Sequence, residues 1–345
     1  MRFSAWRQLG AIVPLLVCVH AAAADGILAP GAQWEELSHN GRFFAEGVVA
    51  AKDGSLYISD MTPSVVFKEN NPGGLLYRFD PATRTQKTLM QPSGMANGLH
   101  VDKNNDLIIA QTADGGGRAI VRRNLATGAM TTLVDSYDGK RLVGPNDVTS
   151  DGNGRLYFTD ARYQGSEPMD LPNAIYRIDP DGKVTQLSTD VLRPNGIEVS
   201  PDGRRLYVAA FNSARLQKNP AGPAADKFGL PLGGVIAYDL DAAGDITNGR
   251  VFFRDDDHGV DGMTMDVDGN LYLALHNGNP REPNGALTVL DPKGDVLARI
   301  PLPEKTLPSN LGFGRGDDAG TLYMTTAFQW RLYRIKTTRQ GHYFN

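Results

Sequence analysis

Residues 144–160, GPNDVTSDGNGRLYFTD, contain the pattern on which the rest of the chain is built. A polar Pro-Asn-Asp triplet leads into a short run, a glycine-rich turn follows at 151–154, and Leu156-Tyr157-Phe158 has the composition of a β-strand. Two short strands joined by a tight glycine-containing turn form a β-hairpin. The stretch therefore predicts a hairpin whose first strand begins with polar side chains.

The same pattern occurs five more times, at 46–60, 97–111, 195–210, 261–275 and 310–326. The six copies begin at residues 46, 97, 146, 195, 261 and 310. Their spacing is about fifty residues, apart from one longer interval before residue 261. This period is too long for the coils of a β-helix, and six copies are too many for a pair of β-sandwiches. It is typical of small sheets repeated around an axis.

Further strand-like runs complete each repeat. A third run follows at 75–79, 119–123, 174–178, 235–238, 286–290 and 331–335, and a fourth precedes the next polar group at 131–134, 184–187 and 250–253. The sixth copy has no fourth run after residue 335, whereas 34–37 alternates ahead of the first copy. We therefore predict an all-β fold, a six-bladed β-propeller with four antiparallel strands per blade. An N-terminal strand would complete the last blade and close the ring.

The first 24 residues differ from the repeats. Arg2 and Arg7 precede an apolar run at 9–19, and small residues fill 21–24. This pattern predicts a secretory signal peptide over 1–24, followed by a single propeller domain over 25–345. The mature protein is then expected in the periplasm or outside the cell, and an uncleaved anchor is the alternative. The sole cysteine, Cys18, lies within this segment, so we expect no disulfide.

Charge and motifs narrow the possible partners. The chain has 35 basic and 39 acidic side chains, a formal net charge of −4. This balance gives no reason to expect nucleic acid, or a membrane after signal cleavage, as a partner. No Gly-x-Ser-x-Gly, His-Glu-x-x-His or Walker motif is present. A small-molecule ligand is the expected partner, and the sequence does not determine an oligomeric state.

The polar residue that begins each copy is the main candidate for chemistry. In a propeller, the starts of the inner strands meet at one mouth of the central channel. We call these six the ring residues: Glu46, Asn97, Asn146, Asn195, Asp261 and Asn310. Converging carboxylates and amides need compensation, and a hard divalent cation with oxygen ligands provides it. We predict one cation, Ca²⁺ first, with Zn²⁺, Mn²⁺, Mg²⁺ or Fe²⁺ as alternatives, held by Glu46, Asn146, Asn195 and Asp261. The alternative is that these residues only form turns.

The second strand of each copy ends at the same mouth, because it runs antiparallel to the first. Its exit residues should therefore join the site, among them Tyr163 and His276. His276 is expected to touch a ligand, with an exposed structural histidine as the alternative. The long insertion at 213–233 leaves from such an exit and is predicted to form a lid or wall over the mouth. The Leu-Tyr pairs of the second strands are predicted to be core.

Three stretches together resemble a known family. They are YDGKRLVGPNDVTSDGNGRLYFTDARY at 137–163, RPNGIEVSPDGRRLYVA at 193–209 and DGMTMDVDGNLYLA at 261–274. They are similar to the gluconolactonase and senescence-marker-protein (regucalcin-like) family of six-bladed propellers, and the likeness extends from Trp34 to about Ile335. The resemblance implies that Glu46, Asn195 and Asp261 bind a divalent metal. It also implies that Asn146 contacts metal or substrate and that Asp261 transfers a proton.

This resemblance implies a metal-dependent lactonase, a carboxylic ester hydrolase that opens a sugar lactone. Asn97, Asn146, Tyr163 and His276 would contact that substrate. Gly144 stands where some animal members have arginine, and Ala161 stands where bacterial members have proline, so the substrate contacts differ from the family pattern. Two alternatives remain. One is hydrolysis of another ester, a phosphotriester or an aryl ester, and the other is a non-catalytic ligand-binding propeller with a structural cation.

Overall fold

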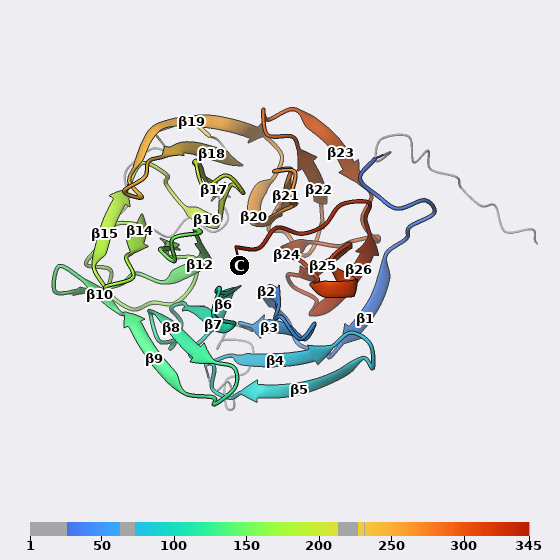
Figure 1. Cartoon of the computed structure of the whole chain (residues 1–345), viewed down its shortest axis with the longest axis horizontal. Helices are drawn as coiled ribbons and strands as arrows, with labels where there is room; N and C mark the ends of the chain where they lie inside the picture. Colours follow the sequence, from blue (N-terminus) through green and yellow to red (C-terminus); the bar gives the residue numbers. More distant parts are fainter. Residues whose placement is uncertain (1–25, 63–72, 213–226, 231, 345) are drawn as a thin grey trace, which may run out of the picture.

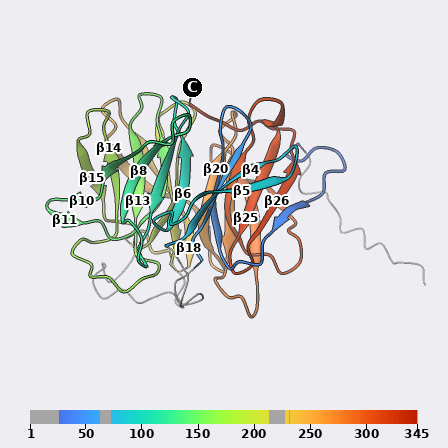
Figure 2. The same ribbon diagram turned by 90° about the horizontal axis from the view of Figure 1, so that it is seen from below.

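The strands form six separate sheets around a central axis. The computed structural model describes residues 26–62, 73–212, 227–230 and 232–344. Each sheet has four antiparallel strands, and the sheets form a closed ring in Figure 1 that is seen from its side in Figure 2. Within the described residues the only helical element is a 3₁₀ turn at Gly316–Asp318. The predicted six-bladed, all-β propeller is confirmed.

Blades 1 to 3 are continuous in sequence. Blade 1 contains β2 (Ala45–Ala50), β3 (Leu56–Asp60), β4 (Leu75–Asp80) and β5 (Thr85–Met90). Blade 2 contains β6 (Ala96–Val101), β7 (Asp106–Gln111), β8 (Ala119–Asn124) and β9 (Met130–Val134). A small hairpin of β10 (Ser136–Tyr137) and β11 (Lys140–Arg141) comes next. Blade 3 contains β12 (Pro145–Ser150), β13 (Leu156–Asp160), β14 (Ala174–Ile178) and β15 (Val184–Ser188).

Blades 4 to 6 complete the ring. Blade 4 contains β16 (Pro194–Val199), β17 (Arg205–Phe211), β18 (Gly233–Leu240) and β19 (Ile246–Asp255). Blade 5 contains β20 (Gly259–Met265), β21 (Leu271–His276), β22 (Gly285–Leu290) and β23 (Val296–Ile300). Blade 6 contains β24 (Pro308–Phe313), β25 (Thr321–Thr326) and β26 (Arg331–Lys336), and its outer strand is β1 (Glu35–His39).

The pairing of β1 with β26 closes the ring, as predicted for the N-terminal strand. The two strands are antiparallel, with Glu35 opposite Arg334. Ion pairs add to the ladder, with Arg334 Nε 2.8 Å from Glu35 Oε2 and Arg331 Nη1 2.6 Å from Glu36 Oε2. These groups are partly exposed, so most of the stabilisation comes from the backbone ladder and from the burial of Leu37. Residues 299 positions apart in sequence are thereby joined in one sheet.

The Leu-Tyr pairs of the second strands pack on both faces of their blades. Leu56 and Tyr57 are 1% and 4% exposed and belong to two different hydrophobic clusters. Leu271 and Tyr272 are divided between two clusters in the same way. Successive side chains of a strand point to opposite faces of the sheet, so each pair supplies the leucine to one inter-blade layer and the tyrosine to the next. The prediction that these pairs are core is confirmed.

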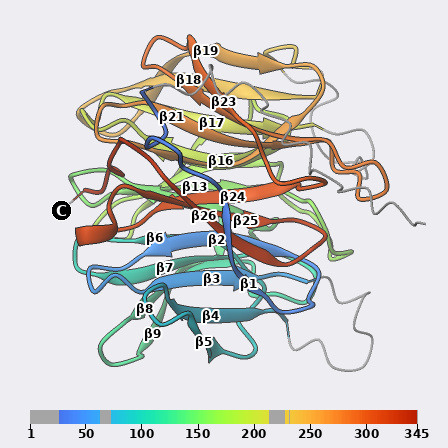
Figure 3. The same cartoon turned by 90° about the vertical axis from the view of Figure 1, so that its right-hand side faces the viewer.

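The C-terminal tail fills the end of the channel opposite Asp261 and the other ring residues of blades 1 to 5. Residues 341–344 lie near the centre of the ring in Figure 1 and at one face in Figures 2 and 3. The His342 N–H donates to the Met265 carbonyl at the end of β20, 2.9 Å away, whereas Asp261 lies near the start of that strand. The Arg315 guanidinium lies 3.8 Å from the centre of the Tyr343 ring. No repeat signal in the sequence predicts this tail.

Two predictions fall outside the described residues. The signal peptide at 1–24 is one, and most of the insertion, residues 213–226 and 231, is the other. Both stay predictions. In the described part of the chain, no helix is long and apolar enough to cross a membrane.

Candidate active site

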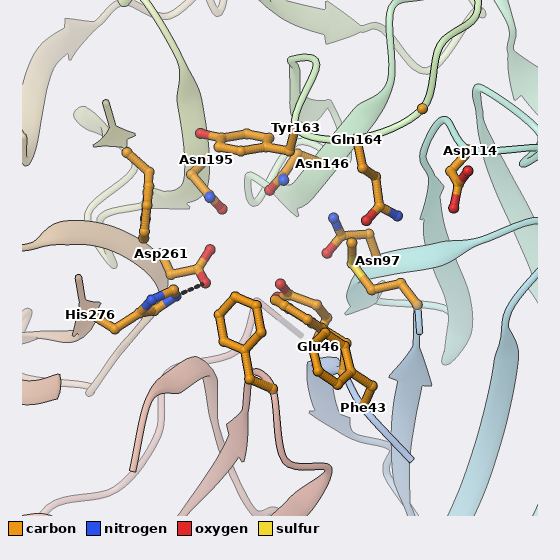
Figure 4. A pocket seen from close by; sticks show the side chains of 15 residues that line it. Phe43, Glu46, Asn97, Asp114, Asn146, Tyr163, Gln164, Asn195, Asp261 and His276 are labelled. Carbon is orange, nitrogen blue, oxygen red and sulfur yellow. Dashed lines mark hydrogen bonds and ion pairs between the residues drawn. The ribbon is translucent and has the colours of Figure 1, made fainter. Parts of the chain in front are cut away.

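Five of the six ring residues face one cavity at a mouth of the channel. The cavity has a volume of about 310 Å³. Figure 4 shows the side chains that line it, pointing into a common open space. The ring residues among them are Glu46, Asn97, Asn146, Asn195 and Asp261. All five are at most 6% exposed, so their polar groups face the cavity and not bulk water. The predicted convergence of these residues is therefore present in the structure.

A break in strand register positions each ring residue. In blade 1 the pair Ala45–Asp60 is followed by Val48–Ile58, so that Glu46 falls where the register between β2 and β3 shifts. The inner strands of the other five blades have the same irregularity at the same place. Such a bulge bends the strand and re-aims the side chain beside it. The repeated bulge therefore turns the ring residues of blades 1 to 5 out of the regular alternation of their strands, whereas Ser309 takes this position in blade 6, one residue before Asn310.

Contacts between neighbouring blades fix these bulges. The Ser59 hydroxyl donates to the Asn97 carbonyl at 2.6 Å, and the Thr159 hydroxyl donates to the Asn195 carbonyl at 2.6 Å. The glycine after a ring residue allows this close approach. A Cβ atom on Gly196 would lie 2.7 Å from the Asp261 carbonyl oxygen, a backbone contact that requires a shift. Inner strands can pack this tightly only where side chains are absent.

Asn310 departs from the other ring residues. It lines a separate cavity further along the channel, together with His342 and Tyr343 of the tail. Its Oδ1 accepts a hydrogen bond from the Leu311 N–H at 2.8 Å. Asn310 therefore corresponds to Asp147 of blade 3, whose Oδ1 accepts the Val148 N–H in the same way, and Ser309 takes the ring position of blade 6. The predicted alignment of the sixth copy is wrong by one residue.

His276 holds one oxygen of Asp261. The two side chains are 4% and 6% exposed, and Nε2 of His276 lies 2.8 Å from Oδ2 of Asp261 (Figure 4). Nδ1 of His276 accepts the Gly278 N–H at 3.0 Å, so the proton of a neutral ring resides on Nε2 and is donated to Asp261. The interpretation of His276 as an exposed structural histidine is therefore wrong. His276 does not occupy Oδ1 of Asp261, so this oxygen can accept a proton during the reaction.

Glu46 is a buried carboxylate beside other carboxylates. Burial raises its pKa well above the usual range, and the nearby charges of Asp261 and Asp147 raise it further. Within the described residues, the cavity lining contains no lysine or arginine. The described lining therefore brings carboxyl groups together with no cationic side chain among them, and the ionised form of Glu46 is disfavoured.

These residues fit a divalent cation. The predicted donor set consists of the carboxylates Glu46 and Asp261 and the amides Asn146 and Asn195, an all-oxygen set that a hard cation prefers. Such a cation would offset the two buried carboxylates. No group of three or more His, Cys, Asp and Glu side chains forms a metal cluster in the described parts of the chain. Cation binding here would therefore depend on the two asparagine amides.

Tyr163 is held firmly at the edge of the cavity. Its hydroxyl donates to the Arg193 carbonyl at 2.9 Å, and the Arg193 guanidinium lies 4.4 Å from the centre of its ring. Burial raises the pKa of Tyr163, so the phenol stays protonated. The hydroxyl proton of Tyr163 is therefore used in the hydrogen bond to Arg193. Toward a substrate hydroxyl, the Tyr163 oxygen can act only as an acceptor.

The sequence did not single out three phenylalanines of the cavity, although it placed Phe211 and Tyr163 at the site. Phe43 and Phe44 come from the loop between β1 and β2, and Phe328 comes from the turn after β25. Phe211 lies at the end of β17, at a second-strand exit where contact with the site was expected. Phe328 lies two residues beyond such an exit, so a wider window around each strand end would have found it. The loop residues Asp114 and Gln164 were also missed.

The fold and cavity together define a class, the six-bladed propellers with a carboxylate-amide site at the channel mouth. The model of the SMP-30/gluconolactonase/LRE-like region matches residues 44–328. The chain therefore belongs to this family, as the resemblance in sequence implied.

Three relatives illustrate this membership. A gluconolactonase of Zymomonas mobilis is 28% identical over 307 residues, which cover 85% of this chain and 79% of that protein. The diisopropyl-fluorophosphatase of Loligo vulgaris is 27% identical over 320 residues, with coverages of 86% and 90%. Among solved structures, a gluconolactonase from Xanthomonas campestris matches with a TM-score of 0.71 and 25% identity, covering 92% of this chain and 93% of the other.

Proposed function

We propose that this protein is a divalent-metal-dependent lactonase, a hydrolase that opens the ring ester of a lactone. The observation that supports it most is the pair of buried carboxylates, Glu46 and Asp261, facing one cavity with asparagine amides around them. Relatives named as gluconolactonases make sugar lactones the first substrates to test. When bound, the cation would supply positive charge that polarises the lactone carbonyl and offsets the charge developing on its oxygen.

The side chains of this chain would carry out the proton transfers. His276 Nε2 donates to Oδ2 of Asp261 and so holds the carboxylate in one orientation. Oδ1 of Asp261 would accept a proton from the attacking water as the water oxygen bonds to the carbonyl carbon. The same carboxyl would return this proton to the ring oxygen when the ester bond breaks, giving a hydroxy acid. Asn97 and Asn146 would hold polar groups of the substrate.

The test is acid release from sugar lactones by the purified protein, measured above the spontaneous rate in buffer. The protein is stripped with chelator and reloaded with Ca²⁺, Zn²⁺, Mn²⁺, Mg²⁺ or Fe²⁺, and cation binding is measured separately by calorimetry. We expect hydrolysis that returns with metal and falls by about 10²–10⁴-fold in Asp261→Asn. Cation binding without hydrolysis of any lactone would instead support a ligand-binding propeller. Hydrolysis that is unchanged by chelation would refute the metal dependence.

A phosphotriester is the second candidate substrate. The similarity to the diisopropyl-fluorophosphatase and the phenylalanines of the cavity favour it, because dialkyl phosphotriesters are neutral and apolar. An assay with paraoxon under the same metal conditions separates the two. Faster turnover of paraoxon than of every lactone would make phosphotriester hydrolysis the better assignment.

We also propose that the protein is exported, on the basis of the signal-peptide pattern at 1–24. Fractionation of cells and N-terminal sequencing of the mature protein test this. A product that retains Arg2 and Arg7 would contradict cleavage.

A further inference from the structure

Aromatic rings follow one side of the candidate active-site cavity without interruption. We define the aromatic wall as Phe43, Phe44, Phe211 and Phe328. Phe43 and Phe44 each lie 5.2 Å, ring centre to ring centre, from Phe328. His276 continues the series, 6.5 Å from Phe328 and 4.7 Å from Phe211. The wall therefore adjoins the imidazole that holds Asp261, and an apolar group beside the reacting bond would contact it.

The aromatic wall is held in place by its own contacts. The N–H groups of Phe43 and Phe44 both donate to Thr62 Oγ1 at 3.2 Å, and that hydroxyl donates to Asp60 Oδ1 at 2.6 Å. Phe328 has a φ of 62°, a left-handed conformation that a bulky side chain rarely adopts. Strain of this kind persists where surrounding structure enforces it, and it is concentrated at ligand sites. The wall is thus a formed surface that needs no rearrangement to bind an apolar group.

The opposite side of the cavity is polar but offers no positive charge. Asn97, Asn146 and Gln164 lie there, and the carboxylate of Asp114 also lines the cavity (Figure 4). The lining formed by the described residues contains neither lysine nor arginine. A carboxylate or phosphate on the substrate would find no cationic side chain among these lining residues, and Glu46 and Asp261 already offset the charge of the proposed cation. The cavity therefore suits a neutral molecule with one polar side and one apolar side.

We propose that the preferred substrate is an uncharged lactone that carries an apolar alkyl or aryl substituent. Its ring ester would lie among Glu46, Asp261 and the amides, and its substituent would lie against the aromatic wall. This inference rests on the proposed lactonase function and narrows its substrate class. A sugar lactone has a hydroxyl on nearly every carbon, so some of these would face phenylalanine rings and lose hydrogen bonds to water. The cavity of about 310 Å³ accepts a substituted six-membered lactone.

Three neutral lactones test this preference. The unsubstituted compound is δ-valerolactone, δ-nonalactone adds a butyl chain to the same ring, and glucono-δ-lactone adds hydroxyls. Each methylene buried against the wall is worth about 0.8 kcal/mol, or roughly fourfold in kcat/KM. With part of the chain in contact, we expect kcat/KM for δ-nonalactone to exceed that for δ-valerolactone by at least about tenfold. We also expect it to exceed the value for glucono-δ-lactone.

Two variants test whether the aromatic wall causes the preference. Phe43→Ala removes one ring, and Phe328→Gly removes another while suiting the left-handed backbone at that position. Each is expected to reduce the nonalactone-to-valerolactone ratio to less than about threefold, because one apolar contact surface is lost. Hydrolysis of δ-valerolactone by the same variant is the reference for this ratio, so a general loss of activity does not count as a loss of preference. Phe344→Ala is the matched control, since it removes an aromatic ring from the tail at the other end of the channel.

The outcomes separate this inference from the function on which it rests. Faster hydrolysis of glucono-δ-lactone than of δ-nonalactone would overturn the inference and leave the lactonase function standing. A nonalactone preference that survives both wall variants, or that falls equally in Phe344→Ala, would also overturn it. Failure to hydrolyse any of the three lactones with any metal would overturn the lactonase function itself.

Discussion

The hydrogen bond between His276 and Asp261 gives the sharpest test of the proposed chemistry. Nε2 of His276 lies 2.8 Å from Oδ2 of Asp261, and both side chains are buried. His276→Leu has a similar volume and removes the donor, so Oδ2 loses its partner while the cavity stays filled. His276→Gln is the matched control, because its side-chain amide nitrogen can occupy a position close to Nε2 of the histidine.

The expected size of the effect follows from the charge on Asp261. A hydrogen bond to a charged group contributes about 1.5–3 kcal/mol. If this bond orients the carboxylate for proton transfer, its loss raises the activation barrier by a similar amount, which is roughly a 10- to 150-fold decrease in kcat. KM should change much less, because Asp261 contacts the reacting water and not the substituents of the substrate. His276→Gln should keep kcat within about tenfold of the native protein.

Steady-state kinetics on a hydrolysed lactone supply kcat and KM for the native protein and both variants. Cation affinity by calorimetry and melting temperature are measured on the same samples, because a merely structural histidine would lower stability in both variants alike. A kcat for His276→Leu within about threefold of native would refute the positioning role. Equal losses in the leucine and glutamine variants would refute it as well.

Three further predictions concern the scaffold. Burial raises the pKa of Glu198 to about 7, whereas the unfolded chain releases this proton near pH 4.5. The folded protein therefore binds one more proton between these pH values, and its free energy of unfolding should fall as pH rises through this range. In urea denaturation, Glu198→Gln should be more stable than the native protein by about 1–3 kcal/mol at pH 8 and should show no gain at pH 4.5. An equal difference in stability at both pH values would contradict the proposed proton linkage. Gly196→Ala places a methyl group 2.7 Å from the Asp261 carbonyl oxygen. The variant should lose about 1–3 kcal/mol of unfolding free energy in thermal melts and should have a lower kcat. A native melting temperature together with a native kcat would contradict the packing argument. Tyr343→Ala should lower the free energy of unfolding by about 2–4 kcal/mol and leave KM unchanged, because the tail lies away from the site. A change in KM of more than about threefold would contradict this placement of the tail.

The sequence predicts the propeller because its signals are local and repeated. Alternating residues and glycine turns define each hairpin, and the missing fourth strand of the last repeat identified β1 as the closing strand. The tail at 341–344 and the hairpin of β10 and β11 occur once each, so no comparison between repeats could reveal them. Their positions depend on tertiary contacts, such as that of His342 with the carbonyl of Met265.

The ring residues predict only part of the candidate site. Equivalent positions in a repeat predict that side chains share a mouth, which five of the six do. They do not predict that Asn310 turns to its own backbone, because the bulge of blade 6 begins at Ser309 and the asparagine stands one residue later than the other ring residues. Nor do they predict the bond from His276 to Asp261, which depends on how far β21 extends before its turn. Proton donors and acceptors are thus set by details of strand ends that the repeat pattern does not encode.

The aromatic wall shows how closing the ring and shaping the site are linked. β1 completes blade 6, and the chain then passes through Phe43 and Phe44 into the inner strand of blade 1. Phe328 lies in the turn between β25 and β26, and β26 is the strand with which β1 pairs. The rings of Phe43 and Phe328 therefore meet only because an N-terminal strand has joined a C-terminal blade. Since the two ends of the chain build this wall together, the apolar side of the cavity exists only in the closed propeller, whereas each ring residue already belongs to a single repeat.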